Sequence, residues 1–363
     1  MIIYLLLPLP ALLTALAFRR LAAGGVVALW AITLVPLVVL MPVGSRDFSI
    51  YLRDYADLQT DPFADAVAQD PLYGSIAWVA GHLGVPSTVF YLCLAALALG
   101  VKLTALHRLG RGATLPIALY MCSFFYLHEF TQLRAALAIG LWMLGIEALP
   151  RSSARYLGLT LLGALVHAQA ALGLLVYPLV RALRTRNRAR LLACAALVVM
   201  ALSVVGLSER ITQQVLEHVP DPRVAIYLAL AENSEGHPNP FSVMSLLAIA
   251  AALAGMLPGD RHDEAGERAP LASRPSTVVF TGLLLGSCAL STFAAVPVAA
   301  FRVSEHFFSL LPIAFWMAAD HLSIGPRKRL LLWLVAGLFL YLFLIHSPYL
   351  LDPATGEPTR EDQ

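Results

Sequence analysis

The sequence predicts an all-α protein, a polytopic bundle of transmembrane helices, from its composition, its hydropathy and the lengths of its apolar runs. Hydrophobic residues make up 59% of the 363 residues and charged residues only 13%, whereas soluble domains carry about 25% charged residues. Mean hydropathy is +0.74. Most apolar runs reach the ~17–25 residues that a spanning helix needs. They lie at 26–43, 83–101, 113–127, 135–146, 191–208, 241–259, 275–301 and 330–351.

Three segments of the chain need separate interpretation. The first, Met1–Phe18, has no basic residues ahead of its apolar run and no small-residue cleavage site, so we expect a retained helix. Tyr73–Gly84 is too short to span and gathers apolar residues on one helical face, which is typical of an interfacial helix. Tyr156–Val180 lies between basic clusters and is too short for two ordinary spans, which favours a tight hairpin with His167 near its apex.

The remaining apolar segments complete a bundle of about ten full spans. Besides residues 1–18 and 26–43, spans are expected at about 86–106, 113–127, 131–149, 190–207, 241–257, 276–299, 303–322 and 330–346.

The distribution of charge orients this bundle, because short loops rich in Lys and Arg stay in the cytoplasm. Basic clusters at 19–20, 102–111, 151–155, 181–190, 261–274 and 327–329 hold 18 of the 25 Lys and Arg. Placing them inside leaves 17 of the 23 acidic residues outside. This topology predicts an inner-membrane protein with both termini extracytoplasmic and one integral-membrane domain over 1–351. Its outer loops are 44–72 and 208–240, and residues 352–363 are predicted to form a disordered acidic tail.

Under this topology the unusual polar residues gather on the outer side. Ionisable groups in or beside membrane spans are costly and indicate function by default. The set comprises Arg46, Asp47, Arg53, Asp54, Tyr55, His128, Glu129, Gln132, Arg134, His167, Arg302, Glu305 and His306.

Other interpretations of these residues stay open. Arg53 and Asp54 could be solvated loop charges, Arg134 could snorkel to the interface, and His167 could be a hydrogen-bonded packing residue. Arg302 and Glu305 stand three residues apart and could pair only with each other.

Several chemistries have no support in the sequence. There is no Walker A, GxSxG, Rossmann or HExxH motif. His128 and Glu129 are adjacent, which is poor spacing for metal ligands on a helix, so no metal and no cofactor is expected. The basic clusters are short loops beside spans, so nucleic-acid binding is not expected.

Four stretches resemble a known family. They are RDFSIYLRDYADL (46–58), DPLYGSIAWVAGHLG (70–84), FFYLHEFTQLRAALAIGLWMLGI (124–146) and LLGALVHAQAALGLLVYPLV (161–180). Together they resemble the EpsG family, Wzy-like membrane proteins associated with exopolysaccharide and O-antigen polymerisation. The elements that match the family pattern are Arg53-Asp54-Tyr55, Asp70-Pro71 with Tyr73, Arg134 before a small-residue helix, and His167. The sequence departs from the pattern at Asp70, where Glu is usual, and at Arg134-Ala135, where the family has Arg-Gln.

The resemblance implies a GT-C-like bundle that polymerises lipid-linked repeat units into exopolysaccharide or O-antigen on the extracytoplasmic face. The implied partners are an undecaprenyl-diphosphate-linked glycan, membrane lipids and other polysaccharide-assembly proteins. Arg134, Arg302 and Arg53 would bind the diphosphate, and His167 or Asp54 would be the base. The residues expected to contact glycan are Tyr55, Tyr73, Gln132, Glu129 and Glu305. The alternatives are a membrane O-acyltransferase that modifies the polysaccharide and a flippase or exporter subunit for lipid-linked glycan.

Overall fold

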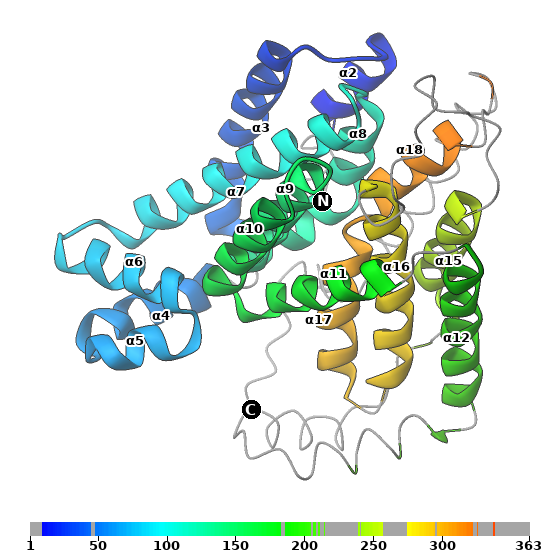
Figure 1. Ribbon diagram of the computed structural model, residues 1–363. Coiled ribbons are helices and arrows are strands. Elements are labelled where there is room, and N and C mark those ends of the chain that lie inside the picture. Colours follow the sequence, from blue (N-terminus) through cyan, green and yellow to red (C-terminus); the bar gives the residue numbers. More distant parts are fainter. Residues whose placement is uncertain are drawn as a thin grey trace, which may run out of the picture. The chain divides into compact units, whose positions relative to one another are not determined.

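The computed structural model describes residues 9–44, 48–182, 186–204, 241–256, 274–294 and 296–321, with a few isolated positions. Within these ranges the secondary structure is helical and contains no strand, which confirms the all-α class (Figure 1). Residues 1–8, Arg46 and Asp47 lie outside the described residues. So do nearly all of the outer loop 208–240, nearly all of the span 330–346, and the tail 352–363.

The predicted number of ten full spans is not confirmed. Two described helices, α7 (Ser87–Leu109) and α16 (Pro275–Thr292), have both the length and the apolar content of a membrane span. Five shorter apolar helices lie at 23–38, 153–166, 168–182, 191–203 and 243–255.

Three of the predicted spans are interrupted. The span 276–299 contains a break between Thr292, where α16 ends, and Pro297, where the next helix begins. In place of a helix over 303–322, the chain forms α17 (Pro297–Phe308) and α18 (Leu311–His321). Proline lies in the first turn of each, where its missing N–H has no helical partner to lose. The predicted span 113–127 becomes α8 (Leu115–Cys122), followed by η1 (Tyr126–Thr131), a π-helical turn.

Much of the predicted outer loop 44–72 is helical. It forms α4 (Phe48–Thr60) and α5 (Phe63–Gln69), and α6 (Pro71–His82) follows directly. On α4 the aromatic residues Phe48, Tyr51 and Tyr55 recur at helical spacing and are buried. α6 buries Tyr73 and exposes Ile76, and Leu83, which directly follows the helix, is also exposed. The apolar face expected for an interfacial helix is therefore divided between protein and surroundings.

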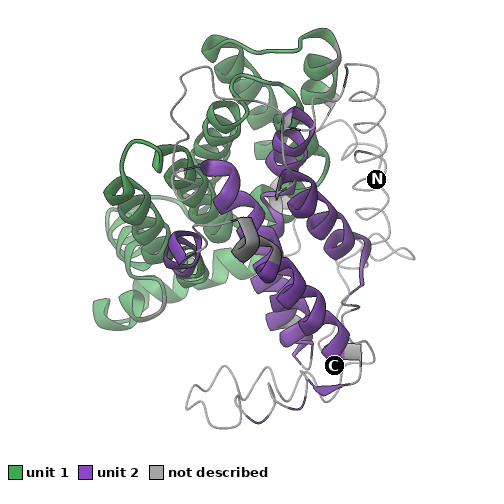
Figure 2. Ribbon diagram, turned by 45° about the vertical axis from the view of Figure 1, so that its right-hand side comes forward, with its two compact units in different colours: residues 1–174, 325–363 green, residues 175–324 purple. Residues whose placement is uncertain are grey.

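The helices form two compact units (Figure 2). Residues 1–174 and 325–363 make up the first, and residues 175–324 the second. In the first, α3 (Ala23–Gly44) packs on α7, α2 (Leu9–Ala17) packs on α8, and α4 and α5 pack on α6. In the second, α16 packs against α17, α12 (Arg186–Val204) and α15 (Val243–Met256), which also packs on α18. The assignment of 1–351 to one domain stays a prediction.

Helix α9 (Leu133–Ala148) packs against both α7 and α10 (Ser153–Val166) in the first unit. Its direction is the same as that of α7, because Ala98 and Ala136 share a core cluster and Val101 lies beside Gly140. Both helices therefore begin at the same end of the unit, which is the relative direction that the predicted topology requires.

Helix α10 runs antiparallel to α9 at close range. A Cβ at Gly163 would lie 2.9 Å from the Ala138 carbonyl oxygen, and one at Gly145 would lie 3.1 Å from that of Tyr156. Moving along α9 from Ala138 to Gly145 thus corresponds to moving back along α10 from Gly163 to Tyr156. The same register, extended the other way, places the start of α9 opposite the residues that follow α10.

The chain turns sharply at His167. α10 ends at Val166, His167 is extended, and η2 (Ala168–Ala171) leads into α11 (Leu172–Ala182). The Tyr156 hydroxyl donates to the Gly173 carbonyl at 2.6 Å, although these residues are 17 apart in sequence. The helical segment is therefore interrupted at His167 and folds back, as the hairpin interpretation expects.

Candidate functional site

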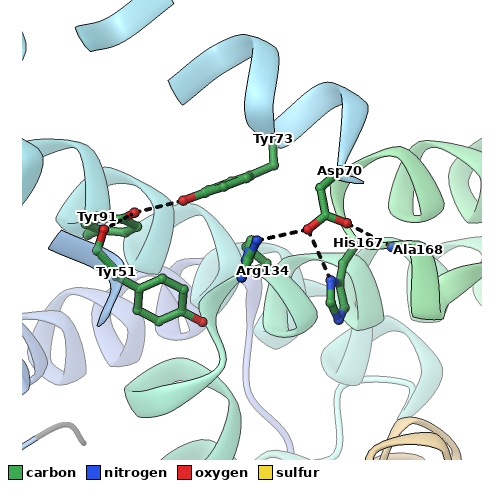
Figure 3. A network of polar contacts seen from close by, with 7 residues as sticks. All are labelled: Tyr51, Asp70, Tyr73, Tyr91, Arg134, His167 and Ala168. Carbon is green, nitrogen blue, oxygen red and sulfur yellow. Dashed lines mark hydrogen bonds and ion pairs between the residues drawn. The ribbon is translucent and has the colours of Figure 1, made fainter. Parts of the chain in front are cut away.

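The candidate site is built around the carboxylate of Asp70, at the corner between α5 and α6 (Figure 3). Its Oδ2 lies 3.0 Å from Nη1 of Arg134 and 3.5 Å from Nδ1 of His167. Its Oδ1 accepts a hydrogen bond from the Ala168 backbone N–H at 3.2 Å. The Asp70 side chain is 8% exposed, and those of Arg134 and His167 are each 26% exposed. One nearly buried carboxylate thus joins three elements, while its two cationic or titratable partners remain accessible.

Local structure explains how residues so far apart in sequence meet. Arg134 lies in the first turn of α9 and His167 directly follows α10, so the antiparallel register of the two helices places them opposite each other. Asp70 is the N-cap residue of α6, and an N-cap Asp ordinarily accepts a hydrogen bond from the first turn of its own helix. Here its side chain makes no capping bond. The carboxylate is directed to the other elements instead.

Aromatic rings enclose the other side of the Arg134 guanidinium. Its Cζ lies 5.0 Å from the centroid of the Tyr73 ring and 5.7 Å from that of Tyr51, within the range of cation–π attraction. The Tyr91 hydroxyl donates to the Tyr51 carbonyl at 2.7 Å and lies 2.8 Å from the Tyr73 hydroxyl, from which it accepts. The rings are therefore tied to one another, and they fix the orientation of the guanidinium.

Asp70 is a carboxylate at neutral pH. Burial disfavours the ionised form and would raise its pKa, but the hydrogen bond from His167, and the charge of that ring when it is protonated, oppose this. The charge of Arg134 and the Ala168 amide act in the same direction, so the pKa of Asp70 is lowered from its ordinary value.

This arrangement offers two chemical functions side by side. Asp70 bonds through one guanidinium nitrogen of Arg134, and a guanidinium has five N–H donors suited to phosphate oxygens. Asp70 accepts from Nδ1 of His167, which leaves Nε2 of the neutral ring as a base. A carboxylate-oriented imidazole beside a cation suits general-base catalysis on a substrate with an anionic leaving group. Within the described ranges, no group of three or more His, Cys, Asp or Glu could hold a metal ion.

The structure brings several predicted residues to this site. Arg134 and His167 share the carboxylate of Asp70, and the Tyr73 ring lies against the guanidinium. Asp54 is half-buried on α4, and its charge acts on Arg134 and Tyr73. Arg53 is exposed on α4, and half-buried Gln132 is the N-cap residue of α9.

Two residues expected to contact glycan have other roles in this geometry. Tyr55 is 2% exposed, donates to the Val85 carbonyl at 2.9 Å and packs against Phe90. Glu129 is fully buried and forms an ion pair with Lys102 at 3.0 Å. Neither side chain presents a surface on which a sugar could bind. The sequence prediction places Lys102 among the charges of an inner loop, but in the structure it is buried in α7.

Arg302 and Glu305 lie on α17, in the second compact unit. Arg302 is exposed and Glu305 is half-buried. Their assignments to diphosphate and glycan binding stay predictions.

Sequence reasoning did not identify Asp70 as part of the chemistry, nor Tyr51 and Tyr91 as the support of Arg134. From the sequence, Asp70 stands out only through the Asp70-Pro71 element that matches the family pattern. One signal could have identified Asp70. It precedes a proline at the first position of a helix, and it lies on the same predicted side of the membrane as Arg134 and His167.

Comparison with known proteins identifies a family. The model of the EpsG family matches residues 27–352. No curated protein and no solved structure matches the chain.

Proposed function

Because the chain belongs to the EpsG family, whose members are membrane proteins of polysaccharide biosynthesis, we propose that it is a glycosyltransferase of the polymerase type. It joins lipid-diphosphate-linked oligosaccharide repeat units into exopolysaccharide or O-antigen on the extracytoplasmic face of the inner membrane. The observation that carries the proposal is the Asp70 carboxylate, which holds an accessible guanidinium and an accessible imidazole together.

In the proposed reaction, an acceptor sugar hydroxyl gives its proton to Nε2 of His167. The hydroxyl oxygen forms a bond to the anomeric carbon of the donor glycan, and the bond from that carbon to the lipid diphosphate breaks. The electron pair of the broken bond leaves with the diphosphate, whose negative charge is stabilised by Arg134. Asp70 stabilises the imidazolium that forms, so it is a positioning residue for the base.

His167 is favoured over Asp54 as the base by its contacts. Nδ1 of His167 is held by the Asp70 carboxylate, which orients the ring and leaves Nε2 as the nitrogen that can accept a proton. His167 also lies on the same carboxylate oxygen as Arg134, so base and leaving group would be adjacent. Asp54, on α4, acts on the site through its charge.

The proposal is tested with full-length protein in vesicles that contain a lipid-diphosphate-linked repeat unit. Wild-type protein should convert the repeat units into longer glycans and release the lipid diphosphate. His167→Ala should abolish both and leave the lipid-linked units intact, and His167→Gln should do no better because an amide is not a base. His82→Ala is the matched control, since His82 is an exposed histidine on α6.

Other outcomes would identify the alternatives. Acyl transfer to glycan without a change in chain length would indicate the O-acyltransferase. Movement of intact lipid-linked units between leaflets, unaffected by His167→Ala, would indicate the flippase. Normal polymer from both His167 variants would exclude His167 as the base.

A further inference from the structure

A second charged cluster lies inside the first unit and takes no part in the proposed reaction. Lys102 of α7 and Glu129 of η1 form an ion pair with 3.0 Å between Nζ and Oε1, and both side chains are 0% exposed. Lys102 donates to the Tyr120 hydroxyl at 2.8 Å, and that hydroxyl donates in turn to the second carboxylate oxygen of Glu129. The three side chains form a closed ring with no face open to a ligand.

Burying two charges costs free energy, so a buried ion pair indicates a specific role at its place in the fold. Glu129 belongs to the π-helical turn η1, which ends directly before Gln132 and α9. π-Helical turns are rare in proteins, and those that occur are often found at functional sites. His128 of the same turn stacks on Phe124 at 5.6 Å and on Tyr120 at 6.4 Å between ring centroids. The turn η1 is therefore held by His128, which stacks on Tyr120 of α8 and on Phe124, and by Glu129, which pairs with Lys102 of α7.

Helix α7 connects this cluster to the candidate site. The Tyr91 hydroxyl, on the same helix as Lys102, holds the Tyr51 carbonyl and the Tyr73 hydroxyl that support Arg134. Lys102 holds the turn from which the helix bearing Arg134 begins. One helix thus fixes both the aromatic wall beside Arg134 and the segment that presents Arg134.

We propose that the Lys102–Glu129 pair, closed by Tyr120, is a positioning device that fixes η1 and thereby the alignment of Arg134 with Asp70, without contacting substrate. The role of that alignment in glycan transfer rests on the function proposed above. The positional effect itself can be measured without any reaction.

The test uses the full-length protein, purified in detergent, with its native cysteines replaced and one reporter, Thr131→Cys. Thr131 is the last residue of η1 and is 8% exposed, so a cysteine there should react slowly with a neutral thiol reagent. Glu129→Gln should raise the alkylation rate about tenfold or more, because an unpaired buried charge favours local opening. Tyr120→Phe keeps the ring and both charges, so it should fold and raise the rate by a smaller factor. Glu147→Gln, which breaks the exposed pair with Arg151 at the other end of α9, is the matched control and should leave the rate unchanged.

Glycan transfer per folded molecule is then measured without the reporter. Glu129→Gln should lower kcat more than it changes KM, since Arg134 is present but misaligned. The exchanged pair Lys102→Glu with Glu129→Lys should recover part of both the slow alkylation and the transfer. The pair Lys102→Met with Glu129→Leu should restore the thermal midpoint but not the transfer.

The outcomes separate the two proposals. If Glu129→Gln and Tyr120→Phe both leave the alkylation rate within a factor of about two of wild type, the positioning role is overturned. Transfer that falls only in proportion to the amount of folded protein would also overturn it, because the pair would then be merely structural. If the alkylation rates change as expected but wild-type protein transfers no glycan, the positional effect stands and the proposed function fails.

Discussion

Arg134 is held on both sides, with Asp70 bonded to one nitrogen and two tyrosine rings beside the guanidinium plane. Its remaining donors form a planar fork that a lysine ammonium cannot reproduce. We expect Arg134→Lys to lower transfer by about 10- to 100-fold, in line with the loss of one charged hydrogen bond. Arg134→Ala should abolish transfer. Product length and yield in vesicles measure both.

The amount of each Arg134 variant in the membrane should match wild type, because Asp70 keeps His167 and the Ala168 amide as partners. Normal polymer from Arg134→Ala would leave Arg134 as an interfacial anchor only.

The lowered pKa of Asp70 predicts how the stability of the protein depends on pH. Its pKa is lowered in the folded protein, so the stability it contributes is fully present above the unfolded value of ~3.9 and is lost as the pH falls through the folded value. Asp70→Asn should therefore have a lower thermal midpoint than wild type at neutral pH, and the difference should shrink below about pH 4. Unfolding of the purified proteins across this range measures it. A wild-type midpoint that rises relative to Asp70→Asn on acidification would mean a raised pKa.

Some residues of the candidate site could be predicted from the sequence, and others could not. Arg134 and His167 could be selected because each interrupts an apolar run on the predicted outer side. Asp70 could not be assigned a role, since its partners are 64, 97 and 98 residues away in sequence and depend on how three elements meet. Tyr55 and Glu129 are of the same residue types as the site residues and lie on the same predicted side of the membrane. Only their packing in the structure shows that they are buried.

At the scale of elements, the register of α9 and α10 depends on small residues at their contact. A Cβ at Gly163 would lie 2.9 Å from a backbone oxygen of α9, which cannot move aside as a side chain could. Gly163→Ala should therefore push α10 away and separate His167 from Arg134. We expect a loss of about 1–3 kcal/mol in the free energy of unfolding and a marked loss of transfer.

A matched control lies on the same helix. A Cβ at Gly158 would meet nothing within 4 Å, so Gly158→Ala should be neutral or stabilise α10 by up to about 1 kcal/mol. Gly163→Ala should lower both the thermal midpoint and transfer, whereas Gly158→Ala should lower neither. Equal effects would show that the α9–α10 contact does not set the site.

Elements could be predicted where hydropathy alone defines them, and less well elsewhere. α7 and the interruption at His167 follow from the apolar runs and their basic flanks. The sequence prediction places 48–60 in an outer loop, although Phe48, Tyr51 and Tyr55 carry the helical period and the segment is helical. Pro297 and Pro312 mark the first turns of α17 and α18, and run length and hydropathy carry no information on such breaks.

For the whole molecule, the predicted topology makes the site accessible from outside the cell. A cysteine at Asp57, which is exposed on α4, should react with a membrane-impermeant thiol reagent on intact spheroplasts. A cysteine at Arg186 should react only after lysis. The native Cys93 and Cys194 are exposed and must be replaced first. Reaction at position 186 in intact cells would reverse the orientation and place the site on the cytoplasmic side.

The order in which the chain is synthesised determines when the Asp70 corner can form. Its carboxylate is made 64 residues before Arg134 and 97 residues before His167. Until those partners are synthesised, burial would remove water from the carboxylate without compensation, so we expect α6 to pack in its final position only after α9 and α10 have been made. The corner can close only after Arg134, His167 and the Ala168 amide have been synthesised. A nascent chain stalled short of residue 134 would carry every part of α4 to α7 and still lack a site.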